Sequence, residues 1–265
     1  QLTYEETSEE YKVIFNKIIM KQSNHLINEI SRSEMVDDKM IGCTAIILTA
    51  LSYNHERFLS YGLNLLKKII NSSFDGEYFP KSRNIRQLVF YLKYFVLIRE
   101  LLKESLNDIP DYLNEIIHYS GKAYTFLWGS IKESLLFNGN NESNLCDFDK
   151  YLNLFKYKFN NNGNELGGYS ILKNKNIIMA MDVGSTPDKR YSENYQSGPL
   201  SFEAIYKGNK IICNSGYFQN HRHKLNNISK SSVAHSTLIL NDKSASTFKK
   251  KNGQNILENG LKSLH

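Results

Sequence analysis

Three histidines in the last third of the chain have positions that could serve proton transfer. His235 stands in Ala-His-Ser-Thr at the entrance of an apolar run, and His221 and His223 form a His-x-His pair in the polar loop before it. Imidazole titrates near neutral pH, so each can accept or donate a proton or contact an anion. The alternatives are a satisfied structural histidine at 235 and an ordinary surface pair at 221 and 223. His235 is the leading candidate, because two neighbouring motifs fix its context.

A second group of chemically useful residues follows Asp75-Gly76, in the segment FDGEYFPKSRN from 74 to 84. Tyr78 could transfer a proton. Arg83 and Arg86 fall in the first turn of the next predicted helix, where a planar guanidinium could hold a carboxylate or sulfate through paired N–H donors. Cations at a helix N-terminus oppose the helix dipole, so either an anionic ligand or a salt bridge to an acid of the same loop is expected. The other interpretation of Tyr78 is a residue folded under the loop.

The third group lies inside the first predicted helix, in Ser23-Asn24-His25-Leu26. The amide of Asn24 could bind a carboxylate, with His25 beside it. Adjacent helical residues point about 100° apart, so the two side chains cannot face one cleft equally. A polar, solvent-exposed helix face is the alternative.

Two different periods of apolar residues predict the elements that must position these groups. Apolar residues recur at three and four through the first 160 residues and at two after about residue 168. Helices are predicted over 8–30, 36–53, 55–72, 83–106, 110–134 and 144–157. Strands are predicted over 168–172, 177–182, 200–206, 210–213 and 237–240. The Asn- and Gly-rich segment 160–168 holds neither period, so we predict a helical domain over 1–160 and a β-domain over 161–265.

Several motifs of the chain together resemble the heparinase II/III-type polysaccharide lyases. The strongest are Leu-Ser-Phe-Glu at 200–203, the apolar run ending in Asn-Ser-Gly at 214–216, and Ala-His-Ser-Thr at 234–237. Asn-His-Leu at 24–26 and Asp-Gly at 75–76 add weaker matches. The resemblance implies an α+β multidomain fold, with helical hairpins of an incomplete (α/α) toroid followed by the start of an antiparallel β-sandwich.

The resemblance also implies an activity, the β-elimination of an acidic, uronate-containing polysaccharide. Such a reaction needs a group that neutralises the uronate carboxylate, a base for the proton at C5, and an acid for the departing glycosidic oxygen. Asn24 would meet the carboxylate, and Tyr78 and His235 would move the protons. Substrate contacts would come from the remaining candidates, which are His25, Arg83, Arg86, Gln196, His221 and His223.

The chain departs from the family pattern at functional positions. Counted from Ser82, the family's tyrosine falls at Ile85. Related enzymes can hold a structural zinc with a His-x-His pair, an Asp and the later His, and the first three ligand positions are here Asn194, Gln196 and Asn214. One histidine with neutral amides is a poor zinc site, so we predict no metal and no cofactor. The alternative function is therefore a non-catalytic carbohydrate-binding or envelope-polysaccharide-processing relative with a degraded active site.

Composition sets broader bounds. The 265 residues carry a formal charge of +6, with 41% hydrophobic and 23% charged residues. No apolar run approaches the ~20 residues of a membrane span. The charge suits an anionic partner, for which we predict an acidic polysaccharide rather than nucleic acid, although lysines along helices are usually a solvated face. The chain begins with Gln1, so we expect a fragment of a longer protein; the resemblance favours the periplasm or cell envelope and leaves the cytoplasm open.

Overall fold

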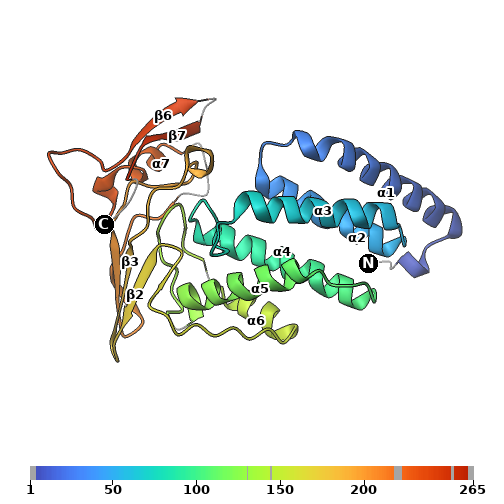
Figure 1. Cartoon of the computed structure of the whole chain (residues 1–265), viewed down its shortest axis with the longest axis horizontal. Coiled ribbons are helices and arrows are strands. Elements are labelled where there is room, and N and C mark those ends of the chain that lie inside the picture. The colour runs from blue at the N-terminus through green and yellow to red at the C-terminus, as the bar shows by residue number, and fades with distance from the viewer. Residues whose placement is uncertain (1–3, 130, 144, 218–222, 252–253, 262–265) are drawn as a thin grey trace. The chain divides into compact units, whose positions relative to one another are not determined.

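The computed structural model describes residues 4–129, 131–143, 145–217, 223–251 and 254–261. Helices come first along the chain and strands follow (Figure 1). The chain divides into two compact units, one made of residues 1–73 and 94–114 and the other of 74–93 and 115–265. Among the described residues, no helix has the length and apolar character needed to cross a membrane.

The first unit is a set of amphipathic helices. It contains α1 (Glu9–Glu29), α2 (Val36–Ser52), α3 (Glu56–Ser73) and the second half of α4 (Ile85–Glu104). Ser8 caps α1 by accepting a hydrogen bond from the Tyr11 N–H at 3.3 Å. The helices α2 and α3 approach closely at Gly62. A Cβ added to this glycine would lie only 2.6 Å from Cγ1 of Ile47. The apolar stripes therefore meet in a common core, which includes Ile30, Ile46, Ala50 and Phe58.

The second unit combines helical segments with a sheet. Its helical part is the first half of α4, most of α5 (Asp111–Tyr124), a π-helical turn (Thr125–Gly129) and α6 (Cys146–Leu154). The strands β1 (Glu165–Leu166), β2 (Tyr169–Lys173), β3 (Ile177–Asp182), β4 (Phe202–Tyr206) and β5 (Asn209–Ile212) form a five-stranded antiparallel meander in chain order. Gly208, with φ +81°, makes the tight β4–β5 turn. The core joins both parts and includes Phe79, Leu88, Phe126, Phe137, Tyr169 and Ile205.

The antiparallel sheet and the six predicted helices confirm the predicted fold class. The strand predicted over 237–240 is wrong. Leu238 and Leu240 are 73% and 68% exposed, and the Thr237 N–H turns back to the His235 carbonyl at 2.9 Å. With no sheet neighbour to cover them, two alternating leucines are not sufficient to make a strand.

Two further elements lie where no strand was predicted. The tail forms a second antiparallel pair, β6 (Thr247–Lys251) with β7 (Gln254–Asn259), and β1 lies inside the predicted linker. The division between compact units also does not follow the predicted boundary after residue 160. Residues 74–93 and 115–160 are helical or irregular, yet they belong to the same unit as the sheet because their apolar side chains share its core.

Candidate functional site

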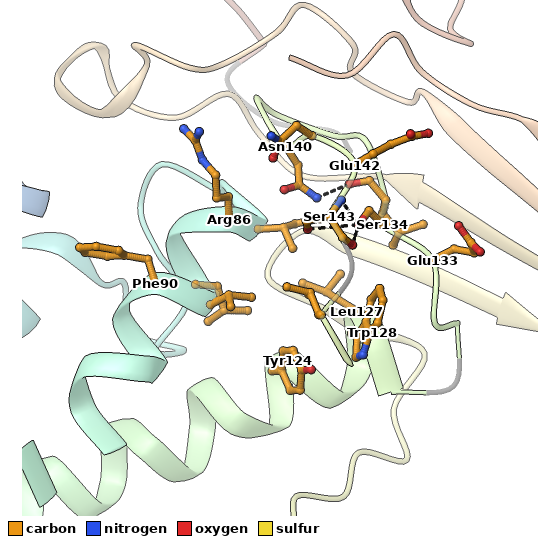
Figure 2. A pocket seen from close by; sticks show the side chains of 16 residues that line it. Arg86, Phe90, Tyr124, Leu127, Trp128, Glu133, Ser134, Asn140, Glu142 and Ser143 are labelled. Atoms are coloured by element: carbon orange, nitrogen blue, oxygen red, sulfur yellow. Dashed lines mark hydrogen bonds between the residues drawn. The ribbon is translucent and has the colours of Figure 1, made fainter. Parts of the chain in front are cut away.

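A cavity of about 350 Å³ lies beside the first turns of α4, the end of α5 and the segment 131–145 (Figure 2). Aromatic and aliphatic side chains form one wall, and polar side chains form the other. The aromatic residues are Phe90, Tyr124 and Trp128. The polar residues include Arg86, Glu133, Ser134, Asn140, Glu142 and Ser143. A mainly apolar hollow with a few convergent polar groups is the usual form of a small-ligand site.

The aromatic wall is fixed from behind by Asp149 on α6. Its carboxylate accepts hydrogen bonds from the Tyr124 hydroxyl at 2.6 Å, the Trp128 Nε1 at 3.1 Å and the Lys132 Nζ at 2.7 Å. Burial opposes the charged form, but the hydrogen bonds from Lys132, Tyr124 and Trp128 hold the pKa of Asp149 below its ordinary value. Burial and the bond to Asp149 raise the pKa of Tyr124. The rings are therefore held in place by one ionised acid.

Arg86 contributes the cation of the cavity. Asn84 caps α4 by accepting hydrogen bonds from the backbone N–H groups of Arg86 at 2.8 Å and Gln87 at 3.3 Å. The Arg86 side chain is half-buried, and within the described part of the chain it forms no salt bridge. Arg86 lines the cavity, and its pairing with a carboxylate or sulfate stays a prediction.

The polar wall is anchored by a buried acid, Glu203 of β4. Its Oε1 accepts from the backbone N–H groups of Leu136 and Asn214, both at 3.0 Å, and from the Asn214 side-chain amide at 3.2 Å. Its Oε2 lies 3.8 Å from Nζ of Lys210. Burial raises the pKa of Glu203, and Lys210 opposes that rise. Because Leu136 follows Ser134 and Leu135 of the cavity, this acid sets the position of the wall.

His235 lies behind that wall, at the end of the same network. Its Nε2 is 2.7 Å from the Ser229 carbonyl oxygen, and its Nδ1 is 3.3 Å from Oδ1 of Asn214, which also accepts from the Ser236 N–H. Burial lowers the pKa of His235. The imidazole is thus neutral near pH 7 and both its nitrogens face protein atoms; it does not line the cavity.

Arg83 does not have the predicted substrate-binding geometry, and this expectation is corrected. All three of its guanidinium nitrogens donate to protein acceptors. Nη2 contacts Asp182 Oδ1 at 2.5 Å and the Gly168 carbonyl at 2.7 Å, Nη1 contacts the Ser185 carbonyl at 2.9 Å, and Nε contacts the Gly167 carbonyl at 3.4 Å. The residue is 8% exposed and sits at φ +57°. Arg83 therefore joins the loop before α4 to the sheet.

Gln196 is also corrected from a substrate contact to a structural residue. It is 1% exposed. Its Nε2 donates to the Gly216 carbonyl at 2.8 Å, and its Oε1 accepts from the Gly139 N–H at 3.0 Å. The amide therefore links the segment around Gly139 to the loop around Gly216 and offers no group to a ligand.

Tyr78 lies apart from the cavity. Its ring stacks on Tyr119 of α5, with centroids 5.0 Å apart, and its hydroxyl hydrogen-bonds to Glu115. That hydrogen bond, with a smaller effect of burial, raises the pKa of Tyr78. The hydroxyl stays protonated at neutral pH, so it is suited to donate a proton rather than to accept one.

The remaining candidates do not join this cavity. Asn24 and His25 are exposed on α1 of the first unit, and the Asn24 amide donates to the Met20 carbonyl at 2.9 Å. His223 is exposed, and its Nδ1 accepts from the Leu225 N–H at 3.3 Å. His221 lies outside the described residues.

The cavity also contains residues that the sequence reasoning missed. Trp128 and Tyr124, which line the cavity, and Asp149, which fixes them from behind, were not predicted. Trp128 is the only tryptophan of the chain, so composition offered a signal for it. Ile85, the position at which counting places the family's tyrosine, lines the same cavity. An isoleucine there supplies apolar surface and no proton.

The residues at the family's zinc positions do not fit the metal. Asn214 and Gln196 use their amides in the hydrogen bonds described above, which leaves His235 as one ligand with a carbonyl partner. With Asn194, the set is three neutral amides and one histidine, which are poor donors for zinc. The described residues contain no group of three His, Cys, Asp or Glu side chains placed to hold a metal ion. The absence of a cofactor stays a prediction.

Comparison with known proteins supports the resemblance noted in the sequence. Residues 163–259 match the family described as "Heparinase II/III-like, C-terminal". A heparan sulfate lyase HepC mutant from Pedobacter heparinus superposes with a TM-score of 0.71 at 14% identity, covering 90% of this chain and 43% of that one. Heparinase III superposes with a TM-score of 0.70 at 16% identity, covering 96% of this chain and 48% of that one. A comparison with curated proteins finds no match.

These likenesses establish the fold. The chain spans less than half the length of each of these solved structures. Residues 163–259 are similar to the heparinase II/III-like C-terminal family, so the resemblance expected from the sequence is confirmed.

Proposed function

We propose that this chain is part of a polysaccharide lyase that cleaves an acidic, uronate-containing polysaccharide by β-elimination. The heparinase II/III-like domain and the likeness to heparan sulfate lyase HepC support the class of protein. The observation that carries the proposal to this chain is the cavity in which Arg86 lies with an aromatic wall. From the resemblance alone, we place the activity in the periplasm or cell envelope.

The lining of the cavity suits a sugar acid. Trp128 and Tyr124 contribute apolar ring atoms to the lining, each with 4% of its surface exposed, and Asp149 fixes both rings. Arg86 can pair bidentately with a carboxylate or sulfate, which would also neutralise the uronate charge. Ser134, Asn140 and Ser143 supply hydroxyl and amide groups near the same wall (Figure 2).

In the elimination, a base takes the proton at C5, the electron pair left behind forms the double bond to C4, and the bond from C4 to the glycosidic oxygen breaks. An acid then protonates that oxygen. The resemblance assigns the base to His235, whose lowered pKa favours the neutral imidazole; one ring nitrogen would have to leave its protein partner to take the proton. The resemblance assigns the acid to Tyr78, whose hydroxyl would have to leave Glu115 to reach the glycosidic oxygen.

A second candidate function is carbohydrate binding without cleavage. Three observations favour it: Ile85 lines the cavity at the family's tyrosine position, both nitrogens of His235 face protein atoms, and Tyr78 hydrogen-bonds to Glu115 outside the cavity. The chain would then keep an acidic-sugar site after losing the chemistry.

One experiment separates the two functions. The full chain is incubated with sulfated and unsulfated uronate polysaccharides, the ultraviolet absorbance of the unsaturated uronate product is followed, and binding is measured by calorimetry. The variants are Arg86→Ala and His235→Ala. The matched control is Arg57→Ala, which removes an exposed arginine of α3.

A rise in absorbance that both variants abolish and the control keeps would support the lyase. Binding that Arg86→Ala weakens, with no absorbance change on any substrate, would support the binding-only relative. Neither binding nor product with any uronate polysaccharide would overturn both.

A further inference from the structure

The β6–β7 hairpin belongs to the same unit as the sheet (Figure 1). Cationic side chains gather around it. Two hollows lie here, of about 380 and 480 Å³, and both are lined by Lys250. Lys230 lines the first hollow, and Lys189, Arg190 and Lys249 line the second. We call these five residues the hairpin surface.

The hairpin surface is held by defined contacts. The Leu257 N–H donates to Oγ of Ser192 at 3.0 Å, and the Ser246 N–H donates to Oγ of Ser197 at 2.7 Å. The Lys230 ammonium donates to the Glu193 carbonyl at 2.5 Å and lies 5.1 Å from the centroid of the Phe248 ring. Lys230 is buried, and the other four cations are exposed on this packed scaffold.

The charge on this surface is poorly balanced within the protein. Among the residues that line the two hollows, Glu258 is the one carboxylate. Within the described part of the chain, Lys189, Arg190, Lys249 and Lys250 make no salt bridge. Clustered like charges repel and raise the local concentration of anions, so an anionic partner would stabilise this arrangement.

We propose that the hairpin surface binds the sulfate or carboxylate groups of an acidic polysaccharide chain, at a site separate from the Arg86 cavity. The identity of the ligand rests on the proposed function. Ser231, Ser244 and Asn227, which line the first hollow, add hydroxyl and amide groups that suit sugar hydroxyls.

The lining favours a polysaccharide over a nucleic acid. Proteins that bind single-stranded nucleic acid stack bases on exposed aromatic rings. The aromatic ring that lines these hollows is Phe248, and the Lys230 ammonium lies over it. A glycan needs no such platform, because its anionic groups pair with the cations directly.

The test compares two pairs of lysines that carry the same charge. In the full chain, Lys249 and Lys250 are both changed to alanine, and the control changes Lys158 and Lys175, which are also exposed and line neither hollow. The dissociation constants for a sulfated uronate polysaccharide, an unsulfated one and a single-stranded DNA of equal charge are measured over a range of salt concentrations. Arg86→Ala is measured alongside.

We expect the Lys249 and Lys250 variant to weaken polysaccharide binding about tenfold and to reduce its salt dependence, while the control stays near the wild type. Weaker binding of the sulfated polysaccharide alone would identify sulfate as the preferred group. Weaker binding of both polysaccharides would show that any anionic group is bound. Equal weakening by the control, or tighter binding to DNA, would overturn the proposal. If Arg86→Ala alone abolished all polysaccharide binding, the hairpin surface would not bind independently, while the proposed function would stand.

Discussion

Arg83 and Arg86 stand three residues apart at the start of one helix, yet their surroundings differ completely. Arg83 is 8% exposed, and its guanidinium contacts Asp182 and three backbone carbonyls. Arg86 is half-buried in the wall of a cavity and forms no salt bridge in the described structure. The first connects the helical and sheet parts of one unit, and the second remains available to a ligand.

The comparison shows how little residue type reveals about role. Arg83 lies in the loop before α4 and Arg86 in the first turn of α4, and both could bind an anion. Asp182, which pairs with Arg83, is 99 residues away in the chain. Removing the partner of a buried charge is strongly destabilising, whereas the half-buried Arg86 keeps part of its contact with water.

The largest expected effect on stability comes from breaking the buried ion pair between Arg83 and Asp182. Arg83→Ala leaves Asp182, which is 1% exposed, as an uncompensated buried charge. We expect the free energy of unfolding to fall by about 3–5 kcal/mol, measured by urea denaturation. A loss below about 1 kcal/mol would mean that Arg83 is no more structural than Arg86, and the contrast would fail.

A smaller effect is expected next to Arg83. The Tyr169 hydroxyl donates to the Arg83 carbonyl at 2.5 Å and accepts from the Asn138 amide at 2.7 Å. Tyr169→Phe keeps the ring and removes both bonds, so stability should fall by about 1–3 kcal/mol. Combined with Arg83→Ala, the losses should not add, because the residues share one network. Strict additivity in that double-mutant cycle would separate Tyr169 from the cluster.

Lys230 is a buried cation whose ammonium contacts a backbone carbonyl and an aromatic ring. Burial lowers the pKa of Lys230 from 10.5 to about 8. Between these values the unfolded chain binds more protons than the folded one, so the free energy of unfolding should rise with pH across this window, by about 1 kcal/mol or more. Denaturation curves measured at several pH values should show that Lys230→Met removes this part of the rise in the free energy of unfolding. If the free energy of unfolding of the variant rose as steeply with pH, burial would not lower the pKa of Lys230.

The smallest expected change in stability is at the open arginine. Arg86→Ala removes a side chain with no salt bridge in the described structure, so the free energy of unfolding should stay within about 0.5 kcal/mol of the wild type. Binding of an acidic saccharide should weaken about tenfold, as measured by calorimetry. A variant that unfolds easily but binds normally would reverse the roles of the two arginines.

Much of the architecture followed from local patterns. The apolar spacing of three and four predicted the helices to within a few residues for α1 to α4, and the apolar alternation over 168–182 and 200–213 predicted the strands of the two hairpins. The strand at 237–240 failed because alternation without a pairing neighbour does not fix a strand. The β6–β7 pair was missed because its lysines gave no core pattern, although Leu257 is buried at 5% exposure.

The sequence by itself determined the helical and hairpin elements, the heparinase-like motifs around His235, and the departure at Ile85. These features are local, since each depends on residues a few positions apart. Only the tertiary structure decided that Arg83 and Gln196 are buried links, that Glu203, Asn214 and His235 form one network, and that Trp128 and Arg86 share a cavity. Those outcomes depend on contacts between segments that are distant in the chain. Where such contacts bury and hydrogen-bond a side chain, its chemical type no longer decides its role.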